Sequence, residues 1–284
     1  MAKSIFGLLL SNSSVENFRA WGSALSAQLG AILTRVPQSN DIDWLTTPLP
    51  SSESYAGSEV YRFNDPLQAT APIFIKFEYG RISGSNTQIR ATVGKTNDGD
   101  GGIGAVLLSP TAVLSAAGAY AVESCYVSGG NAWFALSLAP SNNQRGGFFI
   151  IERAIGTGGQ PIGTALLVGN QALASAAQIH RFIDYANATA EVVSGGIVAI
   201  PLSLSSDRSI ASGTVAPIFP AACISPAGVF WRPRVILGTA RQNAGLGEVI
   251  TGLIDGNSYL SLGAGSQGSD QRSSPFATTL IRWD

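Results

Sequence analysis

The clearest alternation of hydrophobic and polar positions lies between Pro72 and Gly94 (PIFIKFEYGRISGSNTQIRATVG). Every second residue of its first half is large and apolar, and a second alternating run follows from residue 88 to 93. Period-two alternation of β-branched and aromatic residues predicts β-strands. The segment between the runs, 80–87, contains two glycines with Ser and Asn, which predicts a hairpin with a longer loop. We expect one face of this hairpin in the core and the other partly exposed.

A helical pattern lies upstream of the hairpin. Its apolar residues recur every three or four positions, at Phe18, Trp21, Leu25, Leu29 and Ile32. Ser13 followed by Glu16 matches a capping box, so a helix is predicted over residues 15–34, ending before Pro37. The apolar stripe has two interpretations, the core of the chain or a surface that docks on another subunit. For docking, the candidate interface residues are Phe18, Trp21, Leu25, Leu29 and, from the extended segment that follows, Trp44.

Short strand patterns fill much of the remaining sequence. Examples are the segments 132–138 (AWFALSL), 147–153 (GFFIIER), 229–237 and 278–283, separated by stretches rich in Gly, Pro, Ser or Asn. The segment 178–185 (QIHRFIDY) fits either a strand or one helical turn. Many short strands between such turn residues predict a mainly β protein, with antiparallel β-sandwiches and one N-terminal α-helix.

These patterns distinguish two regions. Residues 1–58 hold the helix and an extended docking arm, in which Pro48 and Pro50 disfavour a central position in a sheet. Residues 59–284 hold the β-sandwich region. A Gly- and Ala-rich stretch near 155–175 marks a candidate division of that region into two halves, although no change in charge accompanies it.

Composition favours a protein that works in an assembly. Charged residues make up only 12% of the chain, and hydrophobic residues 45%. Because the cores of subunit interfaces are depleted of charge, we expect a homo-oligomer. A net charge of −1 without clusters of Lys or Arg gives no support for a nucleic-acid partner. The apolar run Ile5–Leu10 is too short to cross a bilayer, so no membrane insertion is expected.

Residues for the common catalytic mechanisms are scarce. His180 is the single histidine and has no nucleophile-elbow motif beside it, so a structural histidine is favoured. Cys125 and Cys223 lack the spacing of a metal or redox motif, and buried thiols are favoured over a disulfide. Acid pairs that cleave glycosidic bonds can lie far apart in sequence, and spacing selects none, whether Glu53 with Glu59 or Glu152 with Asp184. We therefore expect a noncatalytic protein without a cofactor.

The polar loop 97–101 (NDGDG) is the strongest candidate for a metal site. Its alternating oxygen side chains and glycines are of the kind that surround Ca²⁺, which makes Asp98 and Asp100 the candidate ligands. The twelfth-position acid of an EF-hand is lacking, so a turn without metal is the favoured interpretation. The GxGxxG match at 99–104 lacks the sequence context of a nucleotide site and is treated as coincidental.

Fragments along most of the chain resemble virion structural proteins of tailed bacteriophages, from the tail, baseplate and fibre region. The fragments are residues 18–21 (FRAW), 42–44 (IDW), 60–65 (VYRFND), 71–80 (APIFIKFEYG), 93–102, 148–153 (FFIIER), 259–263 (YLSLG) and 280–283 (LIRW). The resemblance implies a component of the virion that is made in the bacterial host cytoplasm and contacts other virion proteins. It assigns no catalytic residue.

Composition and resemblance together predict a noncatalytic structural subunit of the tail, baseplate or neck. The alternative is a receptor- or glycan-binding module displayed on the virion. Such a module would contact a host surface glycan through aromatic residues such as Trp44, Tyr55, Trp133, Trp231 and Trp283. A polysaccharide-cleaving enzyme ranks third.

Overall fold

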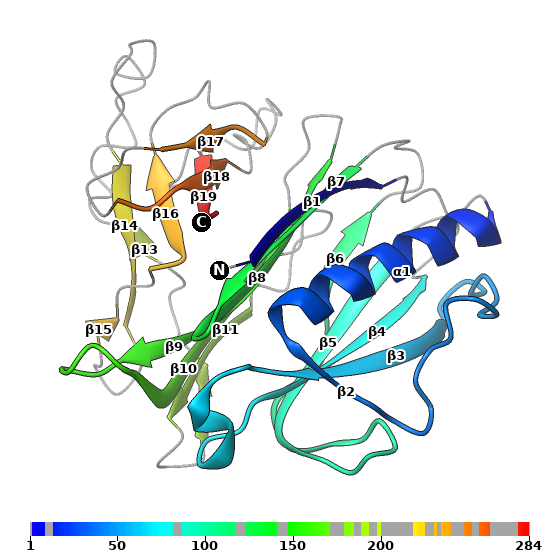
Figure 1. Cartoon of the computed structure of the whole chain (residues 1–284). Helices are drawn as coiled ribbons and strands as arrows, with labels where there is room; N and C mark the ends of the chain where they lie inside the picture. Colours follow the sequence, from blue (N-terminus) through cyan, green and yellow to red (C-terminus); the bar gives the residue numbers. More distant parts are fainter. Residues whose placement is uncertain are drawn as a thin grey trace.

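The computed structural model describes the following residues of the chain: 2–8, 14–81, 87–116, 123–140, 147–170, 179–184, 189–192, 198–199, 218–224, 230–231, 234–239, 247–251, 256–261 and 278–283. They form three antiparallel β-sheets, one α-helix and one short 3-10 helix, η1 (Pro66–Ala69) (Figure 1). The described chain is therefore mainly β with a single N-terminal α-helix, as the sequence predicted.

We name the three sheets by their position in the chain. The N-terminal sheet has the order β2 (Thr34–Val36), β3 (Tyr55–Arg62), β4 (Phe74–Arg81), β5 (Thr87–Asn97), β6 (Ile103–Ala116). The central sheet has the order β1 (Ala2–Leu8), β7 (Glu123–Gly130), β8 (Trp133–Pro140), β9 (Gly147–Ile155), β10 (Pro161–Asn170), β11 (Ile179–Asp184), β12 (Thr189–Val192). The C-terminal sheet has the order β13 (Val198–Ala199), β14 (Ile218–Ile224), β16 (Ile236–Thr239), β19 (Thr278–Arg282), β18 (Tyr259–Ser261), β17 (Val249–Ile250), with β15 (Phe230–Trp231) paired to β14.

The central sheet is buried on both faces. In β8, Phe134 and Leu136 point into a core shared with the N-terminal sheet, whereas Trp133 and Ala135 point into a core shared with the C-terminal sheet. Strand β9 divides in the same way between the two cores. The three sheets therefore stack as three layers with the central sheet in the middle (Figure 1). This arrangement explains why these strands read as nearly continuous apolar runs.

The hairpin predicted around residues 72–94 is confirmed as β4 and β5. The strands pair in register from Phe74 opposite Gly94 to Arg81 opposite Thr87. The inward residues are fully buried, and they are Ile73, Ile75, Phe77 and Tyr79. The outward residues Phe74, Lys76 and Glu78 are only half-buried, so the amphipathic alternation places one face in the core as expected.

The predicted helix is α1 (Val15–Ile32). Its N-cap is Ser14, whose hydroxyl accepts a hydrogen bond from the backbone N–H of Asn17 at 3.1 Å. The capping box based on Ser13 was therefore wrong by one residue. Helical geometry ends at Leu33, where the backbone becomes extended and enters β2.

Several strand boundaries differ from the predictions. Strand β3 begins at Tyr55, inside the 1–58 region that was expected to hold the helix and an extended arm. The segment around residue 180 is a strand, β11, and the alternative of a helical turn is wrong. Strand β1 was not anticipated, and one strand of 14 residues, β6, stands where only short strands were expected. In β6, three register shifts against β5 interrupt the alternation that would have revealed it.

The two regions proposed from the sequence share one core in the structure. Helix α1 and the 34–58 segment pack against β4 and β5 in the same cluster as the central strands. Strand β10 lies across the proposed division near 155–175 and pairs with both β9 and β11. Residues 171–175 of that stretch lie outside the described residues.

Candidate functional site

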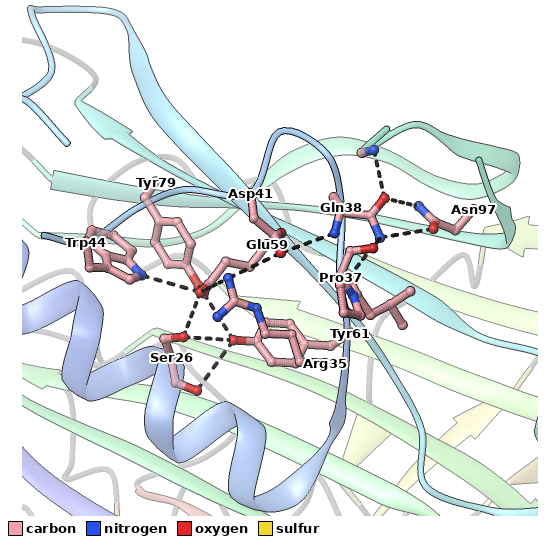
Figure 2. Close-up of polar contacts among 12 residues, drawn as sticks. Ser26, Arg35, Pro37, Gln38, Asp41, Trp44, Glu59, Tyr61, Tyr79 and Asn97 are labelled. Atoms are coloured by element: carbon pink, nitrogen blue, oxygen red, sulfur yellow. Dashed lines mark hydrogen bonds and ion pairs between the residues drawn. The ribbon is translucent and has the colours of Figure 1, made fainter. Parts of the chain in front are cut away.

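The densest polar cluster in the described chain surrounds Glu59, on the inward face of β3. Its side chain is fully buried, between the N-terminal sheet and α1 (Figure 2). An isolated carboxylate in such a place would be strongly unfavourable, so its partners determine what it does.

Five groups from different elements hold the Glu59 carboxylate. Oε2 accepts hydrogen bonds from the hydroxyls of Tyr61 at 3.0 Å and Tyr79 at 2.7 Å. Oε1 accepts from the Ser26 hydroxyl of α1 at 2.6 Å and, at 3.4 Å, from the Trp44 indole N–H. The Arg35 guanidinium of β2 completes the set, with Nη2 at 3.1 Å from Oε1 (Figure 2). The cluster thus joins α1, β2, β3, β4 and the loop that carries Trp44.

Arg35 links this buried carboxylate to a second acid nearer the surface. Its Nη2 lies 3.4 Å from Oδ2 of Asp41, which also accepts from the backbone N–H of Gln38 at 3.2 Å. The side chains of Arg35 and Asp41 are 39% and 20% exposed, so solvent reaches the arginine but not Glu59. The two acids converge on one cation, and neither faces a second carboxylate across an open space.

The two tyrosines of the cluster are held in their protonated form. Burial, reinforced by the negative charge of Glu59, raises the pKa of the Tyr61 and Tyr79 hydroxyls above the ordinary value. They therefore remain hydrogen-bond donors to Glu59 at neutral pH. The arrangement stabilises a charge inside the protein and offers a substrate no access to it.

Strand β9 carries a second set of buried charges, which fixes the central sheet to both neighbouring layers. Arg153 points toward the N-terminal sheet, where it forms an ion pair with Asp65 and donates to the Ala71 carbonyl at 2.9 Å. The preceding residue, Glu152, points the other way and accepts from Arg234 Nε at 3.0 Å and from the Val235 N–H at 3.3 Å. Burial raises the pKa of Glu152, and Arg234 opposes that effect.

The candidate calcium loop is closed by its own hydrogen bonds. Oδ1 of Asp98 accepts from the backbone N–H groups of Asp100 and Gly102, each at 2.8 Å. These bonds lower the pKa of Asp98. Asp100 instead faces the 37–41 loop, where its carboxylate accepts from Ser39 and its carbonyl from Asn40. Among the described residues, neither aspartate belongs to a cluster of three or more His, Cys, Asp or Glu. The hydrogen bonds account for the positions of both aspartates, and calcium binding stays a prediction.

The candidate interface residues contact their own chain. Phe18, Trp21, Leu25 and Leu29 are at most 2% exposed, and Trp44 is 9% exposed. Trp44 packs edge-on against Phe18 and Tyr79, with ring centroids 5.5 and 4.9 Å apart. In this conformation the five side chains form core, so the subunit contacts proposed below draw on other residues.

The aromatic candidates for glycan contact are also used by the fold where they are described. Trp133 and Trp283 are each 4% exposed and lie in the core between the central and C-terminal sheets. Tyr55 is half-buried, with the Arg90 guanidinium 4.1 Å from its ring centroid. The side chains of Trp231, His180 and Cys223 lie outside the described residues, whereas Cys125 is buried in the main core.

Sequence reasoning named Glu59 and Glu152 only as members of catalytic acid pairs and missed their structural role. A usable signal existed in 147–153 (GFFIIER), because two adjacent charged residues at the end of an apolar run point to opposite faces of a strand. Glu59 likewise stands beside Val60 and Tyr61 in a strand pattern. The partners of these acids come from distant segments, and spacing alone could not supply them.

Comparison with protein-family models and with curated proteins found no match. Within the described residues, no helix combines the length and the apolar character needed to span a membrane.

Proposed function

We propose that this chain is a noncatalytic structural subunit of a tailed-bacteriophage virion, acting through contacts with other virion proteins and with copies of itself. The proposal that the chain is noncatalytic rests on one observation, which is that its buried acids are bound by structural partners. Glu59, Asp65 and Glu152 are each occupied by donors that join separate elements of the fold. Such ion pairs hold layers together, and their acids are not available for acid–base work on a polysaccharide.

The virion part rests on the resemblance of the sequence fragments to tail, baseplate and fibre proteins. Low charge supports it further, since 12% charged residues are few for a monomer whose whole surface is exposed to solvent.

The proposal is tested by quantitative mass spectrometry on density-gradient-purified particles of a phage that encodes this chain. We expect the chain in the particle at a fixed ratio to the major tail and capsid proteins, and defective particles when its gene carries an early stop codon. A chain that is abundant in the lysate but absent from purified particles would contradict the proposal. Release of reducing ends from polysaccharide by the purified wild-type protein would instead identify an enzyme.

A further inference from the structure

The central sheet separates two cores that share no described residue. The main core lies between the central sheet, the N-terminal sheet and α1, and its ion pair, Arg153 with Asp65, has both side chains fully buried. The second core lies on the opposite side, under the C-terminal sheet (Figure 1). Its described residues are Tyr126, Trp133, Ala135, Phe148, Ile150 and Leu166 of the central sheet, with Val235, Leu260, Ile281 and Trp283. One core can therefore be disturbed while the other stays intact.

We call the described residues from 198 to 283 the C-terminal layer. This layer is one continuous part of the chain, since the other two sheets are complete at the end of β12, at Val192. Within the described chain its strands pair with each other and with no strand of the central sheet. Across the interface, Ser128 of β7 donates to the Arg282 carbonyl at 2.9 Å, and Trp283 packs edge-on against Tyr126, with ring centroids 5.8 Å apart. Separating the C-terminal layer would break such side-chain contacts but no described strand pairing.

A buried acid lies in this interface. Glu152 of β9 is 1% exposed, and its neighbours across the sheet, Trp133 and Leu166, belong to the second core. All described hydrogen bonds to its carboxylate come from residues 234 and 235 of the C-terminal layer. The side chain of Arg234 is 43% exposed, so water screens this ion pair more than the enclosed pair on the other side of β9. Closing the layer thus removes water from Glu152 without enclosing its partner.

We propose that the C-terminal layer opens from the central sheet as a unit, while the N-terminal and central sheets stay packed on each other, and that Glu152 makes this opening depend on pH. Opening uncovers apolar side chains of the central sheet, such as Trp133, Phe148 and Ile150. It is a property of the fold, and it holds whether or not the chain is a virion protein.

The direction of the pH dependence follows from the burial of Glu152. In the closed state burial raises its pKa above the ordinary 4.5, an effect that Arg234 opposes. Opening returns the carboxylate to water and its pKa toward the ordinary value, so the closed state binds the proton more tightly. Acidification from neutral pH toward 4.5 therefore favours closure, and neutral pH favours opening.

Other charged or titratable side chains are described at the same interface. They are Tyr126, Glu248, Tyr259 and Arg282. The Tyr259 hydroxyl donates to the Arg234 carbonyl at 3.2 Å, and Arg153, the neighbour of Glu152 in β9, faces the main core. Tyrosine and arginine side chains do not titrate between about pH 5 and pH 7. Among these described groups, Glu152 and Glu248 are therefore the two acids that a test must distinguish.

Native-state amide hydrogen exchange of the full chain, measured at rising low concentrations of urea, tests the opening. We expect the amides of β16, β18 and β19 to share one opening free energy, with protection factors lower than those of β4 and β5 by about tenfold or more. Equal protection in the two sets would overturn the proposal, because the layers would then open together. Unrelated opening free energies within the C-terminal layer would also overturn it, because they would indicate local fraying of single strands.

The role of Glu152 is tested by repeating the exchange between about pH 7 and pH 5, with correction for the intrinsic exchange rate. In the wild type the opening constant of β18 and β19 should fall as the pH falls, by at most about tenfold per pH unit for one proton. Glu152→Gln, which cannot ionise, should remove this dependence, whereas the matched variant Glu248→Gln should keep it. A dependence that survives in Glu152→Gln, or an opposite sign in the wild type, would overturn the role of Glu152.

Discussion

Helix α1 contains two glycines that the structure predicts to respond in opposite ways to the same substitution. Replacing a glycine inside a helix by alanine ordinarily stabilises the protein by about 1 kcal/mol, because glycine loses more backbone entropy on folding. Gly30 lies on the exposed side of α1, and a Cβ added there would meet nothing within 4 Å. Gly30→Ala should therefore show the ordinary gain.

Gly22 is different because the six-membered ring of Trp44 lies directly on its Cα. A Cβ at this position would overlap three ring carbons of Trp44. The ring cannot retreat freely, since it packs against Phe18 and Tyr79 and its indole N–H reaches Glu59 at 3.4 Å. Overpacking a buried site costs about 1–3 kcal/mol, and a lost hydrogen bond adds about 0.5–1.5 kcal/mol. After the helix-propensity gain is subtracted, Gly22→Ala should lower the free energy of unfolding by roughly 1–3 kcal/mol.

The assay is equilibrium urea unfolding of both variants beside the wild type, followed by tryptophan fluorescence and far-UV circular dichroism. We expect the free energies of Gly22→Ala and Gly30→Ala to differ by about 2–4 kcal/mol, the sum of the opposing effects. Gly22→Ala combined with Trp44→Leu should show a favourable coupling, because the smaller side chain leaves room for the Cβ. If Gly22→Ala stabilises the chain as much as Gly30→Ala does, the close packing of Trp44 on α1 is refuted.

The buried charges give the remaining predictions. Glu59→Ala should lower the free energy of unfolding by about 3–5 kcal/mol, whereas Ser26→Ala, which removes one donor, should cost only about 1 kcal/mol; urea unfolding distinguishes the two. Arg153→Met should cost about 3–5 kcal/mol by leaving Asp65 buried and unpaired, and Arg153→Met with Asp65→Leu should recover most of it; a double variant as unstable as the single one would contradict this. The folded state raises the pKa of Tyr61 and Tyr79 above the ordinary 10.0, so the folded chain holds protons that the unfolded chain releases. The contribution of these tyrosines to the free energy of unfolding should be fully present below pH 10 and should decrease as the pH rises beyond it. The decrease should be shallower in Tyr61→Phe, and an unchanged slope in that variant would contradict the assignment.

The parts of the fold that the sequence predicted are those where one local rule acts alone. In β4 the residues from Ile73 to Tyr79 alternate without interruption, because one face packs on the core and the other meets solvent. Helix α1 was predicted because its apolar residues recur at helical spacing. Its N-cap was misplaced by one residue, since Ser13 and Ser14 are both good caps and only the backbone geometry distinguishes them.

Other parts could not be predicted because their patterns depend on distant segments. Leu107 and Leu108 of β6 are both buried although adjacent, since the register shifts against β5 turn consecutive side chains inward. The role of Glu59 depends on donors from α1, β2, β4 and the Trp44 loop, which the fold alone brings together. An acid in a strand pattern reads locally as an exposed residue or a catalytic one. Only the assembled partners identify it as structural.

The central claim is that this chain acts through the surfaces that it presents to other subunits. An electron cryomicroscopy reconstruction of the intact particle tests it most directly. We predict density for the three-layer β fold in contact with neighbouring subunits, with Glu59 enclosed by its five partners. A particle without this chain, or a chain that stands clear of its neighbours with Glu59 open to a bound saccharide, would contradict the account.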